Sequence, residues 1–149
     1  MKKILLSTAA IALLFASSCK KSDDNNGPSN GWTLNGTGYN TAAAAVSNGV
    51  LTASSTSPQG AIFVTFGNAT PTAGTYHVMN DDATLTGNQI SFYAYSSNLL
   101  DGYSSTGSGS VDATVTVNGG KVSVSCPDVW VKKSATDSVK LSVNVTQTN

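Results

Sequence analysis

Apolar and polar residues alternate along most of the chain from Gly31 to Asn149, and this pattern constrains the fold more than any other feature. In Val111–Val117, valine or alanine at every second position alternates with aspartate and threonine, and Val139–Val145 repeats the pattern. Side chains of a β-strand point alternately to the two faces of a sheet, so a period of two predicts strands with one buried face. The sequence lacks long runs with apolar residues three and four apart, the spacing of an amphipathic helix. We therefore predict an all-β domain.

Turn-forming residues divide this region into about nine short strands, which favours antiparallel neighbours joined by short turns. A single flat sheet of that size would leave an apolar face in water, so the sheet must fold over or close. We expect an antiparallel β-sandwich, with an up-and-down β-barrel as the alternative. The other predicted strands are Trp32–Leu34, Ala43–Ser47, Val50–Ser54, Ile62–Phe66, Gly74–Met79, Ile90–Tyr95 and Val122–Cys126, and Val129–Val131 continues the last of these.

The clearest hairpin signal is Asn118-Gly119-Gly120, because asparagine and glycine accept the positive φ of tight reversing turns. The strand that follows places Cys126 on the same face as Val122 and Val124, so we expect its thiol to be buried. Pro127 is expected to end the pairing of that strand, because proline has no N–H to donate.

The composition of residues 31–149 limits the classes of partner. This region has no Arg and no Glu, four Lys and six Asp, a net charge of −2, and 33 Ser or Thr among 119 residues. Serine and threonine suit the polar faces of strands and the turns between them. The weak negative charge gives no electrostatic reason to bind nucleic acid.

The N-terminus has the order of an export signal. Lys2 and Lys3 precede an apolar run of 12 residues, Ile4–Phe15, that is interrupted by Ser7 and Thr8. A helix that spans a membrane needs about 20 residues, so a cleaved signal peptide over residues 1–18 is the better interpretation. Small residues then lead to Cys19.

A cysteine in this place resembles the signal of a bacterial lipoprotein, in which Cys19 is acylated and becomes the first residue of the mature chain. The resemblance implies attachment to a membrane through lipid on Cys19, and two or more acyl chains attach a protein firmly. Residue 16, where such signals usually have leucine, is alanine here. Ordinary secretion is the alternative.

Residues 19–30 are then the lipidated cysteine and a flexible tether, because charge, Asn, Gly and Pro replace apolar residues there. Lys20-Lys21-Ser22-Asp23-Asp24 resembles the short charged signal that directs some Bacteroidota lipoproteins to the outer face. We expect a lipid anchor in the outer membrane with the domain exposed on the cell surface, and the periplasmic face is the alternative.

Two further segments, Pro71–Tyr76 and Thr106–Val111, are similar to parts of small uncharacterised Bacteroidota-type lipoproteins with one all-β domain. That resemblance implies a fold class and a location, and no activity.

Groups for catalysis are scarce. His77 is the only histidine of the domain, and Gly107-Ser108-Gly109 is interpreted as a turn because it lacks the spacing of a nucleophile elbow. Asp81 and Asp82 are interpreted as loop residues. We expect no enzymatic activity, no cofactor and no metal site, since zinc usually needs four ligands and calcium six to eight oxygens.

Aromatic residues are the best lead to function. Tyr93 and Tyr95 lie opposite the face of Ile90 and Phe92, and Trp130 lies opposite its valine neighbours. Exposed rings beside polar acceptors would suit a glycan or a partner protein, whereas buried or scattered rings would carry no function. The leading hypothesis is a non-enzymatic envelope lipoprotein that binds such a ligand. A structural or assembly accessory subunit of an envelope complex is second, and a hydrolase is third.

Overall fold

The structure is a computed structural model that describes residues 27–97 and 102–148. The predicted signal peptide 1–18, Cys19 and residues 20–26 of the predicted tether lie outside these ranges. Of the tether, the last residues contact the domain: the Asn144 side chain donates a hydrogen bond to the Ser29 carbonyl (2.9 Å), and the Thr146 N–H donates to the Asn30 side chain (2.9 Å).

The described residues form ten strands. In chain order these are β1 (Gly31–Leu34), β2 (Thr37–Asn40), β3 (Ala43–Ser47), β4 (Val50–Thr56), β5 (Gln59–Phe66), β6 (Gly74–Asn80), β7 (Gln89–Ser96), β8 (Tyr103–Asn118), β9 (Lys121–Lys132) and β10 (Ser138–Thr146).

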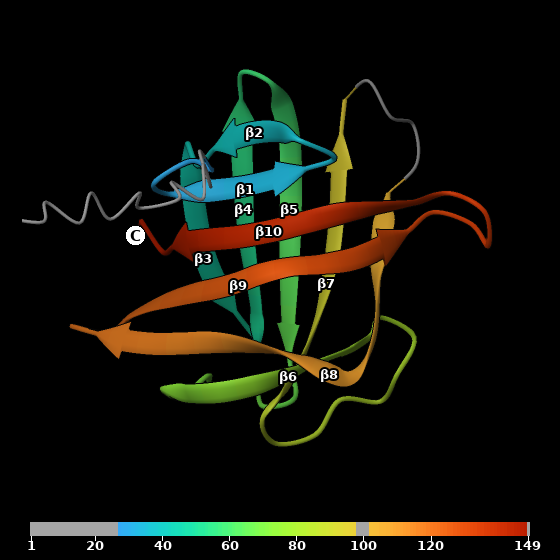
Figure 1. Ribbon diagram of the computed structural model, residues 1–149. Coiled ribbons are helices and arrows are strands. Elements are labelled where there is room, and N and C mark those ends of the chain that lie inside the picture. The colour runs from blue at the N-terminus through green and yellow to red at the C-terminus, as the bar shows by residue number, and fades with distance from the viewer. Residues whose placement is uncertain (1–26, 98–101, 149) are drawn as a thin grey trace, which may run out of the picture.

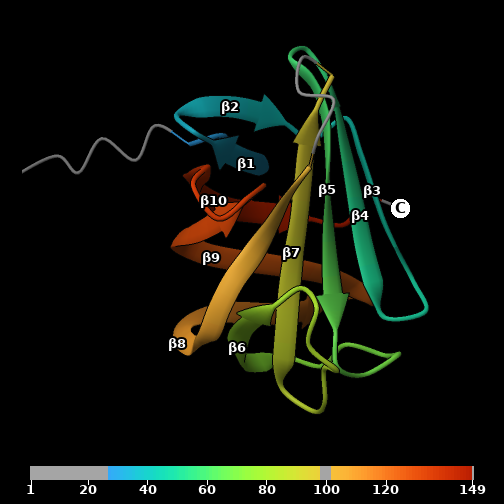
Figure 2. The same ribbon diagram turned by 90° about the vertical axis from the view of Figure 1, so that its right-hand side faces the viewer.

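All ten strands belong to one sheet, in the order β2-β1-β10-β9-β8-β6-β7-β5-β4-β3. Every pair is antiparallel except a short parallel contact between β6 and β7. The sheet folds over on itself: β1, β2, β8, β9 and β10 form one layer, and β3, β4, β5 and β7 lie behind and cross them steeply (Figure 1). Figure 2 shows the same layers from the side, with β6 between their lower ends.

The all-β prediction is confirmed, and the layers come from one continuous sheet of ten strands rather than nine. The ring of strands is partial. Among the described residues, β2 and β3 are not paired with each other, and the chain after β10 bridges to β3 instead. There the Thr148 N–H donates to the Ala44 carbonyl (3.0 Å), and the Ala44 N–H donates to the Thr148 hydroxyl (2.9 Å).

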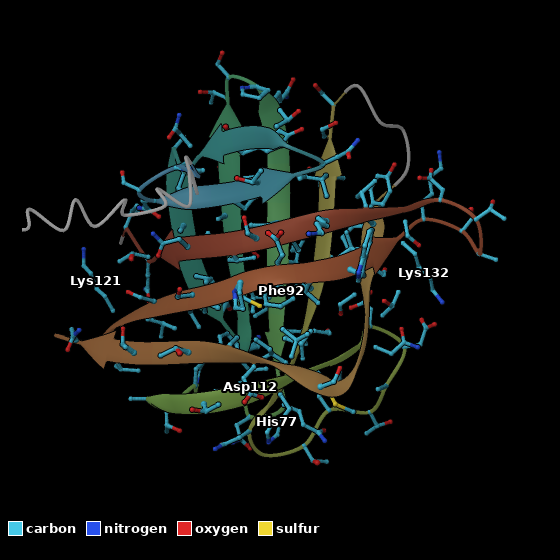
Figure 3. The ribbon with its side chains drawn as sticks, viewed as in Figure 1. His77, Phe92, Asp112, Lys121 and Lys132 are labelled. Carbon is cyan, nitrogen blue, oxygen red and sulfur yellow. The ribbon has the colours of Figure 1, made fainter. Side chains whose placement is uncertain are left out.

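The inner faces of the two layers enclose one apolar core. Trp32 and Tyr39 stack with ring centroids 5.2 Å apart, and Tyr76 meets Phe66 edge to face at 5.7 Å. Phe92, labelled in Figure 3, is fully buried. Burial of aromatic and branched side chains of this kind supplies most of the favourable free energy of folding. The alternation predicted for the strands therefore marks the inner face correctly.

Two-residue hairpins set the register of four strand pairs, β1–β2, β3–β4, β4–β5 and β8–β9. Asn118 pairs with Lys121 across Gly119 and Gly120, whose φ angles are 58° and 79°, so the predicted hairpin is confirmed. The sequence analysis missed β2, although Asn35-Gly36 carries the same signal, with φ angles of 50° and 78°. Positive φ at both central residues matches the twist of the strands on either side.

Pro127 does not end its strand, contrary to the prediction. Val129 pairs with Leu141 and Cys126 pairs with Val143, so two residues of β9 face the single residue Ser142 of β10. This β-bulge accommodates the missing N–H of proline. It also shifts the side-chain alternation by one residue, which keeps Cys126 and Val129 on the same buried face.

Gly107-Ser108-Gly109 is likewise not a turn but part of the long strand β8. A Cβ atom on Gly107 would lie 2.2 Å from the Val78 carbonyl oxygen, so only glycine allows this approach of β8 to β6. Gly109 has a φ of 83°, and the register with β6 shifts close by. The bend lets β8 pair with β7 and β9 near Ser104 and with β6 and β9 further along.

Candidate functional site: an aromatic patch on the outer face of the sheet

Three aromatic side chains lie next to each other on the outer face of β5 and β7, the face directed away from the core. Phe63 pairs directly with Tyr93 across the two strands. Its ring centroid is 6.1 Å from that of Tyr93 and 6.3 Å from that of Tyr95. Tyr93 is 37% exposed and Tyr95 is 39% exposed. We call Phe63, Tyr93 and Tyr95 the aromatic patch.

A hollow of about 480 Å³, with serine, threonine and glutamine among its lining residues, adjoins Tyr95. In the cross-strand row that contains Tyr95, its neighbours are Ala61 and then Ser54, both smaller than the ring. The small side chain of Ala61 between them leaves space beside the tyrosine. This volume is within the range of small-molecule sites. The lining residues are Ser54, Ser55, Thr56, Gln59, Gly60, Ala61, Tyr95 and Ser97.

Asp81 lies at the other side of the patch and is held by two serines. The Ser91 hydroxyl donates to one carboxylate oxygen and the Ser104 hydroxyl to the other, each at 3.0 Å. Ser104 pairs with Tyr93 across β7 and β8, and Ser91 precedes Tyr93 by two residues on the same face of β7. The carboxylate is thus fixed beside the base of the Tyr93 ring. Asp81 lies in the turn after β6, as predicted for a loop residue, but its serine partners are 10 and 23 residues away and leave no local pattern in the sequence. Phe63 was not predicted, because it joins the patch through the pairing of β5 with β7.

Trp130 belongs to a different surface. It is 55% exposed on β9, where it pairs with Lys140 of β10, and the Lys140 ammonium is 6.0 Å from its ring centroid. Lys140 also forms an ion pair with Asp128 at 3.1 Å. A separate broad groove of about 940 Å³ is lined by residues of β1, β9 and β10. The structure therefore brings Tyr93 and Tyr95 together, and it places Trp130 in the other layer.

His77 and Asp112 form an exposed hydrogen-bonded pair on β6 and β8, at the lower edge of Figure 3. The distance from His77 Nδ1 to Asp112 Oδ1 is 2.7 Å, and each side chain is 56% exposed. A hydrolytic triad needs a serine or cysteine nucleophile hydrogen-bonded to the second ring nitrogen. In the part of the chain that the structure describes, the hydrogen bond of the His77 ring is the one to Asp112.

The thiol of Cys126 is buried on the inner face of β9, where only 3% of the residue is exposed, as its alternation predicted. Burial, together with the smaller effect of the negative charges of Asp112 and Asp128, raises its pKa from 9.0 to about 12. A thiol with a raised pKa is a poor nucleophile and metal ligand, because the thiolate is the reactive form.

Neither a membrane-spanning helix nor a cluster of metal ligands occurs in residues 27–97 and 102–148. No helix there has the length and apolar character needed to cross a membrane. No three His, Cys, Asp or Glu side chains of these ranges gather as ligands of a metal ion.

Comparisons with known proteins also gave no match: no family model, no curated protein and no solved structure is similar to this chain. The evidence for function therefore comes from the residues themselves.

The exposure of the patch predicts small effects on stability. Tyr93→Ala and Tyr95→Ala should each change the free energy of unfolding by about 1 kcal/mol or less, as substitutions at exposed positions usually do. Trp130→Ala should behave in the same way. Tyr76→Ala is the matched control, because that ring is fully buried and aromatic-to-alanine changes in a core cost about 3–5 kcal/mol. Thermal melts of the four variants measure this, and a large loss for Tyr93 or Tyr95 would contradict an exposed patch.

Proposed function

We propose that the chain is a non-enzymatic lipoprotein of the cell envelope, attached to the outer membrane through Cys19, whose domain binds a glycan at the aromatic patch. The observation that supports binding is the arrangement of Tyr93 and Tyr95: they are adjacent, exposed and supported by Phe63. A ligand that covers these exposed rings removes their apolar surface from water, and this burial favours binding.

Polar groups on both sides of the rings favour a glycan over a protein surface. A sugar ring offers an apolar face of C–H groups that stacks on an aromatic ring, and hydroxyls at its edge that need hydrogen-bond partners. Serine, threonine and glutamine side chains around the hollow provide such partners on one side, and the Asp81 carboxylate provides them on the other. The hollow is large enough for a sugar unit, and the patch extends the contact.

The proposed location rests on the sequence alone. The basic start, the short apolar run and the small residues before Cys19 support a lipoprotein signal. The charged residues after Cys19 support exposure on the cell surface, with the periplasmic face as the alternative. A surface-exposed domain would meet glycans of the cell's own envelope or of its surroundings.

A glycan array tests the proposed binding. The full chain in a mild detergent should give a signal on a restricted set of glycans, and Tyr93→Ala or Tyr95→Ala should weaken that signal. Loss of one stacked ring should cost about 1–3 kcal/mol, the scale measured for aromatic stacking on nucleic-acid bases, or roughly 5- to 150-fold in affinity. Trp130→Ala is the control that should leave binding unchanged. If the wild-type chain binds no glycan but captures an envelope protein through the same tyrosines, the glycan proposal is wrong.

A further inference from the structure

Asp81 is a charged group that hydrogen bonds fix beside the aromatic patch. Its own N–H donates to the Ser105 carbonyl (3.2 Å), and its two carboxylate oxygens accept from Ser91 and Ser104. Two hydroxyls, one from β7 and one from β8, therefore hold the half-buried carboxylate, and a backbone hydrogen bond to β8 holds the residue that carries it. A side chain held in this way loses little conformational entropy when a ligand binds to it.

The carboxylate keeps capacity to accept further hydrogen bonds. An ionised carboxylate offers about four lone-pair sites, and the two serine hydroxyls use one on each oxygen. One site remains on each oxygen of a group that is still partly exposed. Two neighbouring hydroxyls of one sugar ring can donate to the two oxygens together, and hydrogen bonds to a charged acceptor are about twice as strong as neutral ones.

The position of Asp81 relative to Tyr93 determines what can be bound there. Ser91 lies two residues from Tyr93 along β7, about 7 Å between Cα atoms, and Ser104 is its direct neighbour on β8. A sugar stacked on Tyr93 thus has its edge over the carboxylate. A ligand with its own carboxylate or sulfate at that edge would be repelled, and it would bring no donor for the Asp81 oxygens.

Lys132 is the competing feature, because an ammonium would favour an anionic ligand. It pairs with Ser104 on the far side of β8, two strand spacings or about 10 Å from Tyr93 at the Cα atoms. In the described ranges, Lys132 has no ion pair with Asp81. Because Asp81 is hydrogen-bonded to Ser91 and Ser104, which lie next to Tyr93 on the same face, its charge has the greater influence on a ligand over that ring.

We infer that Asp81 determines specificity: together with the aromatic patch, it selects neutral, hydroxyl-rich glycans and rejects anionic ones. This inference rests on the proposed glycan binding and specifies its ligand class. The predicted consequence is a preference for a neutral oligosaccharide over the same oligosaccharide with uronic acid units.

Titration calorimetry of the full chain with a neutral hexose oligosaccharide and its uronic acid counterpart tests this inference. The wild type should prefer the neutral ligand at least tenfold. Asp81→Asn should reduce that preference to about threefold or less, because the amide nitrogen is a donor and the charge is gone. Ser104→Ala keeps the charge but removes one donor that fixes it, and it should weaken binding of the neutral ligand severalfold. Asp82→Asn, at the exposed neighbouring position, is the matched control and should behave as the wild type.

The outcomes separate the two proposals. If both oligosaccharides bind with similar affinity and Asp81→Asn changes nothing, the role of Asp81 is refuted while glycan binding stands. Tighter binding of the acidic ligand that disappears in Lys132→Gln also refutes it, because Lys132 would then be the selecting residue. If neither ligand binds to the wild type and no other glycan does so on the array, both proposals are wrong.

Discussion

Replacing Cys126 with aspartate should remove most or all of the stability of the domain. The side chain is buried among the inner-face residues of β9, with no partner for a charge. Burial can raise the pKa of a carboxyl group by 3–5 units, and each unit corresponds to about 1.4 kcal/mol, so the expected loss at neutral pH is about 4–5 kcal/mol or more. Asp112 and Asp128, which already disfavour a thiolate there, would add repulsion. A domain of this size is stable by only about 5–15 kcal/mol.

Urea unfolding followed by circular dichroism measures this loss. Cys126→Ala is the matched control and should cost only about 1 kcal/mol or somewhat more, because it removes a small core group. The Cys126→Asp variant should recover part of its stability at acidic pH, where the carboxyl group is neutral. A fully stable Cys126→Asp variant, or fast labelling of native Cys126 by a bulky thiol reagent, would show that the inner-face assignment is wrong.

The same thiol predicts how stability changes at high pH. The folded-state pKa of about 12 lies above the ordinary thiol pKa of 9.0, so the unfolded chain loses the proton first as pH rises. The contribution of the neutral thiol is therefore complete below pH 9 and is lost between pH 9 and 12. The wild type should lose stability relative to Cys126→Ala by up to about 1.4 kcal/mol per pH unit in that window. Parallel pH profiles of the two proteins would contradict the burial of the thiol.

Cys19→Ser should move the protein from the membrane fraction to the soluble fraction. The acyl chains contribute about 0.8 kcal/mol per buried CH₂, and serine cannot carry the thioether-linked lipid, so the firm attachment is lost. Ser22→Ala is the control and should stay with the membranes. The unfolding midpoint should not change, because residues 27–148 contain the whole described sheet. Retention of Cys19→Ser on membranes after a salt wash would refute the lipoprotein proposal.

Much of the fold could be predicted because its signals are local. Alternation places the core-facing residues of β8, β9 and β10, and the glycine pair after Asn118 sets the β8–β9 register. The bulge at Pro127 was not predicted. A break in alternation does not show whether a strand ends or continues after a bulge with its side chains shifted by one residue. The bend at Gly107 was missed for a related reason: the need for glycine comes from the Val78 carbonyl, which is distant in sequence.

The candidate site could be predicted only in part. Alternation correctly placed Tyr93 and Tyr95 on an outer face. It also placed Trp130 on an outer face, and it did not show which of these rings are neighbours. Which exposed rings meet is decided by strand order, and β5 and β7 are neighbours only because β6 is placed elsewhere in the sheet. Phe63 joins the patch through that pairing.

Calorimetric titration of an array-selected glycan into the full chain and into the Tyr93→Ala/Tyr95→Ala double variant tests the central claim most directly. If the aromatic patch is the ligand-binding surface, the double variant should bind at least about thirtyfold more weakly, since two stacked rings, each contributing about 1–3 kcal/mol, are lost. Its thermal melt should remain close to that of the wild type, and Trp130→Ala should bind normally. Wild-type affinity in the folded double variant, or loss of binding in Trp130→Ala, would contradict the account.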